Sequence, residues 1–557
     1  ARPRTRIEPD RAEAALSPLV DVDWPNWRRW QMAIWIGIVL VYLLGTGGSW
    51  WPSKDSALYL GLGRSLAAGE GYVFNGEPCN YVSPGMSWII SPFYLLTDQP
   101  VFLLNIWLSL TGLASLVLIW RTLCHWTDAK TALLVTAITA VSYRFYLSAH
   151  EILSDQTFTL LFWLVLYSWT RFGKGRWTWT PLLLVGAFAA AWVRSPGLLA
   201  LSACSAGVLL DRSARPMRRV VGSGLIFLGS CASVGIQYLW AKALVQDSVG
   251  YARSLLKPDN VLMYYLQQMG LGTRNWLEVL SEGLISQEFI FSVGIPLAIF
   301  WVIGSVLQIR ARRPLAAVTV FLLLLLYTLG VNADAVRSRY MIPVVPMFIW
   351  LVFLGLQWVV AAAARRKQAN VRQAALRAAM VFGGICLAMN VVKVGRWVFW
   401  YTPQTYLAGY PITQRGGGHY QTFQVAQFLN QPGRPAGSIV MTHQAGRIMH
   451  YLTGRVIHVI EPRSIDDPEV RNAENPIQAL RMERQTAADA DRTIGHVRRY
   501  LDQSAGILID REGASELFTR RLDEQIATLA QENGMDQVYQ SPRFTLYMKE
   551  TSPESGD

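Results

Sequence analysis

The chain has 557 residues, of which 52% are hydrophobic and 16% charged, and its formal net charge is +13. A soluble protein of this length would carry more charge and would lack apolar runs of membrane length. The positive charge does not indicate a nucleic-acid partner, because Lys and Arg gather in cytoplasmic loops of membrane proteins and at anionic lipid surfaces. The five cysteines form no CxxC pair, so the sequence indicates neither a zinc site nor a disulfide framework.

Apolar runs recur along the first 400 residues, starting with a first span at 31–47 that we expect to be retained. The run 83–97 is short and contains two prolines, which is unfavourable for a spanning helix. If 83–97 does not cross, the basic loops share one face of the membrane, as the positive-inside rule requires. We therefore expect 83–97 to be re-entrant or to lie on the surface. We also expect about eleven spans of roughly 20 residues, and up to about thirteen. The other runs lie near 101–120, 131–148, 156–171, 179–193, 196–210, 220–241, 289–309, 314–331, 340–363 and 376–398.

This topology predicts a cytoplasmic tail at 1–30, a transmembrane domain at 31–400 and a far-side domain at 401–557. The first loop, 48–100, would face the far side with the C-terminal domain. After residue 400 the composition becomes that of a soluble protein, with strands in "GSIVMTH" and "AGILIDR" and a hairpin in "QVYQSPRFTLYMK". Helical patterns in "TFQVAQFLN", 483–503 and "ASELFTRRLDEQIATLAQENG" separate them, and "GRIMHYLTGRVIHVI" reads as a helix that runs into a further strand. The alternation predicts a soluble α/β domain with a partly parallel sheet.

Three acidic residues stand at far-side positions of the predicted topology. Asp55 follows the first span and fits either an N-cap or a functional role. Glu151 and Asp155 are four residues apart, so a continuous helix would place them on one face. Buried acids at a membrane boundary are usually functional or paired, although Asp155 also fits the cap of the next span. A divalent metal bound by Glu77, Asp155 or His150 is a weaker hypothesis, because these residues lack tight ligand spacing.

Three arginines, Arg194, Arg337 and Arg339, also stand on the predicted far side, against the positive-inside trend. Planar guanidinium groups bind phosphate through two parallel hydrogen bonds. The alternative is that these long side chains extend to the membrane interface without a ligand. The segment "THQAGRIMHYLTGR", with His443 and His450, fits either a surface turn or an acceptor contact, and we favour the surface turn.

An acid after the first span, the loop "AAGEGYVFNGEPCNYVSPG", an acid opening a later span and "RSRYMIPVVP" occur in this order. The pattern resembles the GT-C fold membrane glycosyltransferases, in particular the protein O-mannosyltransferases and the lipid A aminoarabinose transferase. The resemblance implies a hexosyl- or pentosyltransferase in the bacterial inner membrane, multi-pass, with a cytoplasmic N-terminus and a periplasmic C-terminal domain. It would transfer a sugar, with inversion, from a polyprenyl-phosphate donor to a lipid, glycan or protein acceptor. No nucleic acid is expected as a partner.

The same resemblance assigns roles to individual residues. Asp55 would be the base, Asp155 would support the site, and Arg339 and Tyr340 would line it. Val82-Ser83-Pro84-Gly85 stands where the family often has Lys-Pro-Pro, so Lys54 or Arg64 would replace that phosphate contact, beside Arg194 and Arg337. Apart from the resemblance, the rings of Tyr59, Tyr72 and Tyr81 suit the faces of sugars, although interfacial anchoring explains some of them equally well. The candidates for substrate contact are thus Tyr59, Tyr72, Glu77, Tyr81, Glu151 and Tyr340, with Glu77 the weaker one.

Two other classes of function compete with this hypothesis. A transporter or flippase of a lipid-linked or anionic substrate would also contain intramembrane acids and arginines, but it should show two related halves, and none is found. A non-catalytic assembly or sensor protein would use the C-terminal domain to bind a partner, and loss of Asp55 would then leave function intact. The residues define neither the sugar, the acceptor nor a required cofactor.

Overall fold

The computed structural model describes residues 26–48, 50–79, 82–244, 290–330, 338–366, 371–401, 418–432, 434, 437–442, 446–459, 487–511 and 516–549. The chain divides into two compact units that do not follow chain order. The helical unit comprises 1–49, 80–89 and 96–409, and the α/β unit comprises 50–79, 90–95 and 410–557. Most of the first loop therefore groups with the C-terminal segment and not with the helices that flank it. That the chain leaves the membrane for good near residue 400 stays a prediction.

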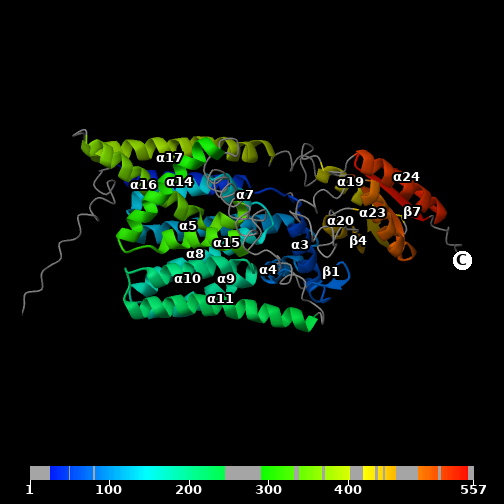
Figure 1. Cartoon of the computed structure of the whole chain (residues 1–557), viewed down its shortest axis with the longest axis horizontal. Helices are drawn as coiled ribbons and strands as arrows, with labels where there is room; N and C mark the ends of the chain where they lie inside the picture. The colour runs from blue at the N-terminus through cyan, green and yellow to red at the C-terminus, as the bar shows by residue number, and fades with distance from the viewer. Residues whose placement is uncertain are drawn as a thin grey trace, which may run out of the picture. The chain divides into compact units, whose positions relative to one another are not determined.

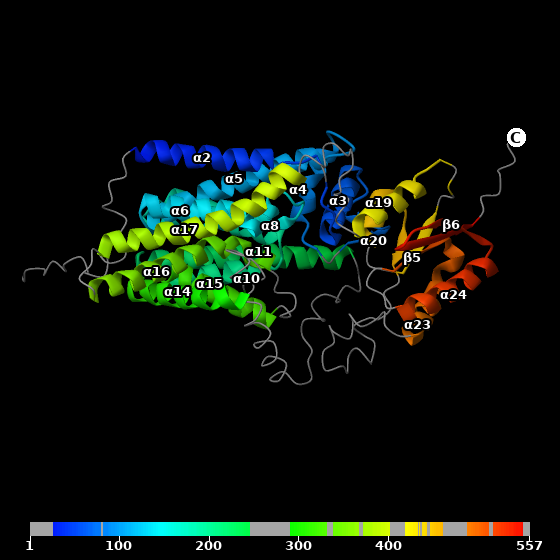
Figure 2. The ribbon, with the colours of Figure 1, turned by 90° about the horizontal axis from the view of Figure 1, so that it is seen from above.

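Eleven helices of 13 residues or more build the described part of the helical unit, and they run along a common direction (Figure 1 and Figure 2). They are α2 (Trp27–Leu44), α5 (Val101–Trp126), α6 (Ala129–Val141), α8 (Ser154–Gly173), α9 (Thr180–Val193), α10 (Gly197–Leu210), α11 (Pro216–Leu244), α14 (Ile290–Arg310), α15 (Leu315–Gly330), α16 (Val345–Arg366) and α17 (Val371–Arg396). The short helix α7 (Tyr143–Ser148) and the 3₁₀-helix η4 (Ser338–Val344) connect them, while α4 (Gly85–Tyr94) is divided, with residues 85–89 in this unit and 90–94 in the α/β unit.

Four helices in the described ranges are both long and apolar enough to cross a membrane, and they cover 101–126, 216–240, 339–365 and 381–399. Helices α6, α9 and α10 have only 13, 14 and 14 residues, so the expected length of about 20 residues is wrong for them. Helix α4 has 10 residues. It is therefore about 15 Å long, too short to cross a hydrocarbon core of about 30 Å. This agrees with the prediction that 83–97 does not cross, while the total number of spans stays a prediction.

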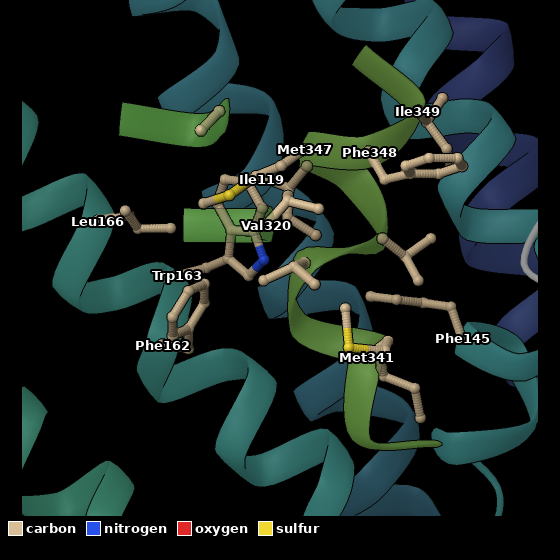
Figure 3. Close-up of a cluster of buried hydrophobic side chains, with 14 of the residues drawn as sticks. Ile119, Phe145, Phe162, Trp163, Leu166, Val320, Met341, Met347, Phe348 and Ile349 are labelled. Atoms are coloured by element: carbon tan, nitrogen blue, oxygen red, sulfur yellow. The ribbon is translucent and has the colours of Figure 1, made fainter. Parts of the chain in front are cut away.

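A buried tryptophan links α8 to η4 in the core of the helical unit (Figure 3). Trp163 of α8 is fully buried, and its indole N–H donates to the carbonyl oxygen of Pro343 at 2.8 Å. Around it pack apolar side chains of η4 and α16, including Met341 and Phe348. Because a buried polar group without a partner is costly, this hydrogen bond favours one position of η4 against α8. The same helix, α8, thus fixes the segment that carries Arg339 and Tyr340.

The α/β unit is built on a five-stranded sheet of order β4-β3-β5-β7-β6. Strands β4, β3 and β5 are parallel, and β5, β7 and β6 are antiparallel, which confirms the predicted partly parallel sheet. The strands are β3 (Ser438–Met441), β4 (Ile457–Val459), β5 (Ser504–Asp510), β6 (Met535–Gln540) and β7 (Phe544–Lys549). The helices are α19 (Gly418–Leu429), α20 (Gly446–Thr453), α23 (Ala487–Tyr500) and α24 (Glu516–Glu532), with the 3₁₀-helix η6 (Leu501–Gln503) after α23.

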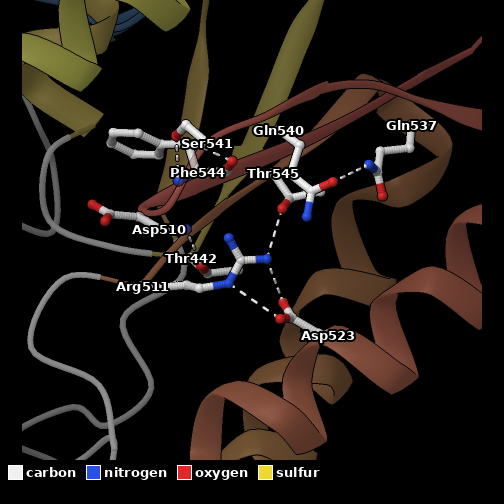
Figure 4. A network of polar contacts seen from close by, with 9 residues as sticks. All are labelled: Thr442, Asp510, Arg511, Asp523, Gln537, Gln540, Ser541, Phe544 and Thr545. Atoms are coloured by element: carbon white, nitrogen blue, oxygen red, sulfur yellow. Dashed lines mark hydrogen bonds and ion pairs between the residues drawn. The ribbon is translucent and has the colours of Figure 1, made fainter. Parts of the chain in front are cut away.

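The alternation of side chains along β5 separates two layers of helices. Ile507 and Ile509 pack in a core with α23 and α24, whereas Leu508 packs with α19 and α20 on the other face. A network of polar contacts follows the C-terminal end of β5 (Figure 4). There Arg511 donates to Asp523 of α24 at 2.9 and 3.1 Å and to Thr545 of β7 at 2.6 Å. These bonds hold α24 against the sheet.

The first-loop part of the α/β unit consists of helix α3 (Lys54–Ala67) and a small hairpin of β1 (Val73–Phe74) and β2 (Glu77–Pro78). The two-residue turn of the hairpin is Asn75-Gly76, with φ of 57° and 82°. Asn-Gly is the preferred sequence for such a turn, because both residues tolerate positive φ. The hairpin places Glu77 at an exposed position.

Candidate functional site

A buried ion pair forms the centre of the candidate site in the helical unit. Nη1 of Arg194 lies 2.7 Å from Oδ1 of Asp155, and the two side chains are 8% and 3% exposed. The same nitrogen donates to the hydroxyl of Ser154 at 3.1 Å. The other carboxylate oxygen of Asp155 is buried and has no hydrogen-bond partner among the described residues. The expectation that Asp155 caps α8 is wrong, because the N-cap is Leu153 and Asp155 lies in the first turn.

Arg194 of this pair and Arg339 both lie close to one aromatic ring. The guanidinium carbon of Arg194 lies 4.8 Å from the ring centroid of Tyr340, and that of Arg339 lies 5.3 Å from it. Cations favour the face of an aromatic ring, and the attraction grows where water is excluded. Both guanidinium groups therefore contact the same aromatic ring. The structure thus brings together Asp155, Arg194, Arg339 and Tyr340, which the sequence analysis selected from three separate segments.

Glu151 lies in the turn between α7 and α8 and is electrostatically coupled to this group. The pKa of Glu151 is raised to about 7, mainly by burial and also by the charge of Asp155, while Arg144 and Arg339 act in the opposite direction. The four-residue spacing would place Glu151 and Asp155 on one face of a continuous helix. They do not share a helix, because α7 ends at Ser148 and α8 begins at Ser154. Arg144 was missed in the sequence analysis, since one arginine in the apolar run "AVSYRFYL" resembles an interfacial anchor.

The break between α9 and α10 that carries Arg194 is fixed by the start of α4. The hydroxyl of Ser83 accepts a hydrogen bond from the backbone N–H of Ser195 at 2.6 Å and also bonds to the hydroxyl of Ser195. Ser195 in turn donates to Gln237 of α11 at 3.0 Å, and Gln237 donates to the carbonyl of Ala191 at 2.9 Å. These hydrogen bonds therefore connect the start of α4, the break after α9 and helix α11.

Gly85 fits against the end of α9 so closely that a methyl group has no room there. A Cβ atom at Gly85 would lie 2.7 Å from the carbonyl oxygen of Trp192 and from Cα of Val193. We expect Gly85→Ala to lower the free energy of unfolding by about 1–3 kcal/mol and to displace Arg194, because backbone atoms must move. Thermal unfolding in detergent measures the loss. Gly224→Ala is the control, since nothing lies within 4 Å of its added Cβ, and an equal loss in both variants would contradict the prediction.

The raised pKa of Glu151 predicts a pH-dependent stability. Since the folded-state pKa of about 7 exceeds the ordinary 4.5, ionisation opposes folding. The contribution is complete below pH 4.5 and is lost as pH rises through 7, by about 3 kcal/mol at most. We expect the melting temperature of Glu151→Gln to fall less between pH 5 and 8 than that of the wild type. The exposed Glu524→Gln serves as control, and parallel curves for Glu151→Gln and wild type would refute the assignment.

In the α/β unit, Asp55 lies in the first turn of α3 but does not cap it. The N-cap is Ser53, whose hydroxyl accepts from the N–H of Ser56 at 3.0 Å, while the Ser56 hydroxyl accepts from the N–H of Ser53 at 2.8 Å. This reciprocal capping box satisfies the end of the helix. The N-cap expectation for Asp55 is therefore wrong, and the carboxylate is not needed to begin the helix.

The other first-loop residues have different surroundings. Lys54 and Glu77 are exposed, and the exposed Arg64 stacks on the ring of Tyr451 at 5.5 Å. Tyr59 and Tyr72 are buried, with 9% and 3% exposure. Their predicted contacts with phosphate and sugar stay predictions. Tyr81, Arg337 and His443 lie outside the described residues.

His450 does not lie in the surface turn that we favoured but in the helix expected from "GRIMHYLTGRVIHVI". It lies in α20, and both of its ring nitrogens are hydrogen-bonded, to the carbonyl of Arg455 at 2.6 Å and to the N–H of Asn75 at 3.2 Å. In the helical unit, buried His150 lies 3.3 Å from the hydroxyl of Ser109. Within the described ranges, no group of three or more His, Cys, Asp or Glu side chains is arranged to hold a metal ion.

The sequence matches no protein-family model and no curated protein, but the structure is similar to several solved structures. One is ArnT from Cupriavidus metallidurans bound to undecaprenyl phosphate, with 12% identity and a TM-score of 0.57 over 95% of this chain and 100% of that chain. Another is the oligosaccharyltransferase of Archaeoglobus fulgidus tethered with an acceptor peptide, with 10% identity and a TM-score of 0.53 over 87% and 70%. Both neighbours are GT-C fold glycosyltransferases. This chain has the GT-C fold.

The predicted resemblance is thereby confirmed at the level of the fold. A GT-C fold with several apolar helices makes the chain a multi-pass membrane protein. At 10–12% identity the likeness establishes the fold and not the reaction. The chemistry of this GT-C chain must therefore be argued from its own residues, above all from the group around Arg194.

Proposed function

We propose that the protein is an inverting glycosyltransferase that transfers a sugar from a polyprenyl-phosphate donor to an extracytoplasmic acceptor. The observation that carries the proposal is the buried ion pair of Arg194 and Asp155, with the half-buried Arg339 and Tyr340 beside it. Two guanidinium groups close together suit a lipid phosphate, because they bind it through charge-assisted hydrogen bonds. The fold supports this choice of donor, since one GT-C neighbour was solved with undecaprenyl phosphate and another with a dolichol-phosphate.

The reaction is a substitution at the anomeric carbon. The bond from this carbon to the phosphate oxygen breaks, and the electron pair leaves with the lipid phosphate. The acceptor oxygen forms the new bond from the opposite side, and its proton passes to the carboxylate of Asp55. Arg194 and Arg339 stabilise the charge that grows on the phosphate, usually the largest single contribution in such a site. The unpaired oxygen of Asp155 supplies an acceptor for a sugar hydroxyl.

The proposal includes a location and partners. The enzyme would lie in a bacterial inner membrane with residues 401–557 on the outer side, where no nucleotide sugar is available as donor. The positive-inside distribution of Lys and Arg supports this orientation. The acceptor would be a lipid, a glycan or a protein hydroxyl group. Lys54, Arg64, Arg337 and the tyrosines of the first loop are proposed contacts to the donor and the sugar.

The test is turnover of a radiolabelled polyprenyl-phosphate sugar by the purified protein in nanodiscs, with membrane lipids and peptides as acceptors. We expect released polyprenyl phosphate and labelled acceptor from the wild type, and at least a hundredfold less from Arg194→Gln. The matched control is Arg171→Gln, because Arg171 also stacks on a tyrosine, Tyr167, but near the opposite end of α8. Movement of the intact lipid across vesicles without sugar release would overturn the proposal in favour of a transporter.

A further inference from the structure

The α/β unit joins the first loop to the C-terminal segment through the side chain of Asn75. Its amide nitrogen donates to the carbonyl of Ile457 at 2.8 Å, and its amide oxygen accepts from the N–H of Ile457 at 2.7 Å. Ile457 begins β4, which is an edge strand of the five-stranded sheet. The side chain thus makes the pair of bonds that a further strand would make at this edge. We call Asn75, His450 and Ile457 the Asn75 bridge.

His450 completes this bridge from α20. The carbonyl of Arg455 can only accept, so Nδ1 of His450 carries the hydrogen, and Nε2 is left to accept from the N–H of Asn75. The ring of Phe74 packs edge-on against the imidazole, with 4.6 Å between ring centres. The backbone and the side chain of Asn75 are therefore both held by the C-terminal segment.

The residue after His450 reaches both ends of α3. The ring of Tyr451 contacts that of Trp50 edge-on at 4.9 Å, and the indole N–H of Trp50 donates to Ser56 at 2.9 Å, within the capping box. At the other end of α3, the guanidinium of Arg64 stacks on the same tyrosine ring at 5.5 Å. The hydroxyl of Tyr94 also bonds to that of Tyr451 at 3.0 Å. Helix α20 therefore contacts α3 on both sides of Asp55.

We propose that Asn75, His450 and Tyr451 are positioning residues for the transfer reaction: they hold α3, and with it Asp55, in the orientation needed for proton transfer. The inference rests on the proposed role of Asp55 as base. A small displacement of a catalytic group is sufficient for a large effect, since a shift of about 1 Å costs on the order of 10²-fold in rate. The C-terminal α/β segment thus takes part in catalysis without contacting the reacting atoms.

The test uses Asn75→Gly in the full chain, because glycine keeps the positive φ of the turn and removes only the two side-chain bonds. We measure hydrogen–deuterium exchange of residues 54–67, and the kcat and donor KM of turnover. We expect exchange in α3 to be at least tenfold faster and kcat at least tenfold lower, with the donor KM changed less than twofold. Asn75→Asp keeps the acceptor oxygen and the turn, so it should restore part of kcat.

The matched control is Asn430→Gly, which removes an asparagine bond to the carbonyl of Leu452 in the same unit without touching the first loop. Unchanged exchange in α3 of Asn75→Gly would overturn the inference, and so would faster exchange with an unchanged kcat. The exchange measurement does not depend on activity. A wild type without turnover would therefore refute the proposed function, while protection of α3 by the bridge would still be measured separately.

Discussion

Asp55→Asn is expected to lower turnover of the polyprenyl-phosphate donor by a hundredfold or more. Asparagine has the size of aspartate but cannot accept the proton of the acceptor, and general-base catalysis contributes about 10²–10⁴-fold. Because Ser53 and Ser56 cap α3, the substitution leaves the start of the helix intact. We therefore expect the melting temperature to stay within a few degrees of the wild type. The measurements are single-turnover release of labelled lipid phosphate and thermal unfolding.

Ser53→Ala is the control for this prediction, since it should lower the melting temperature and leave turnover largely unchanged. Loss of the cap costs about 0.5–2 kcal/mol of stability without removing the proposed base. If Asp55→Asn retains wild-type turnover, the base must be assigned to another carboxylate. The exposed Glu77 would be the first to test in the same unit, and Asp155 in the helical unit.

Asp155→Leu is expected to lower the free energy of unfolding by about 3–5 kcal/mol, because it removes the carboxylate that pairs with the buried Arg194. The double variant Asp155→Leu/Arg194→Met should regain most of this stability, since apolar replacement of a buried ion pair is often neutral. It should remain inactive, because the phosphate contact is lost. Thermal unfolding and donor turnover of both variants separate the two effects.

Two results for the double variant would contradict this prediction. If it is as unstable as Asp155→Leu alone, the loss of stability does not arise from breaking the Asp155–Arg194 ion pair. If it is stable and turns over the donor, the ion pair is structural and the phosphate site lies elsewhere. Only recovered stability together with lost turnover fits a pair that is retained for function.

Local patterns predicted much of the fold. The strands and helices after residue 400 follow apolar periodicity and turn residues closely, so β3, β5 and the β6–β7 hairpin were expected where they lie. Charge statistics selected Arg194 and Arg339 because a far-side arginine contradicts the positive-inside trend. The sequence could not show that Arg194 contacts Asp155 and Tyr340, since these residues come from three helical segments whose packing decides the contact.

Other features of the structure were not predicted from the sequence, for different physical reasons. Asp55 and Asp155 each precede a helical pattern in the way a cap does, yet Ser53 and Leu153 occupy the cap positions, because a shift of one or two residues is invisible to periodicity. The Asn75-Gly76 turn is a strong hairpin signal, but its two strands have only two residues each, too few to show alternation. The partner of Asn75 lies in a segment that no local pattern connects to it.

The distance along the chain between Asn75 and Ile457 has a consequence for biosynthesis. These residues are 382 positions apart. At a synthesis rate of about 5–20 residues per second, the first loop must wait roughly 20–75 s for its partner to leave the ribosome. During this time the helices that lie between the two segments in the chain can enter the membrane, while the first loop lacks its bonds to α20 and β4. A nascent chain that stops before α20 would thus lack the contacts that hold α3, so under the proposed function the synthesis of α20 and β4 would have to precede the first turnover.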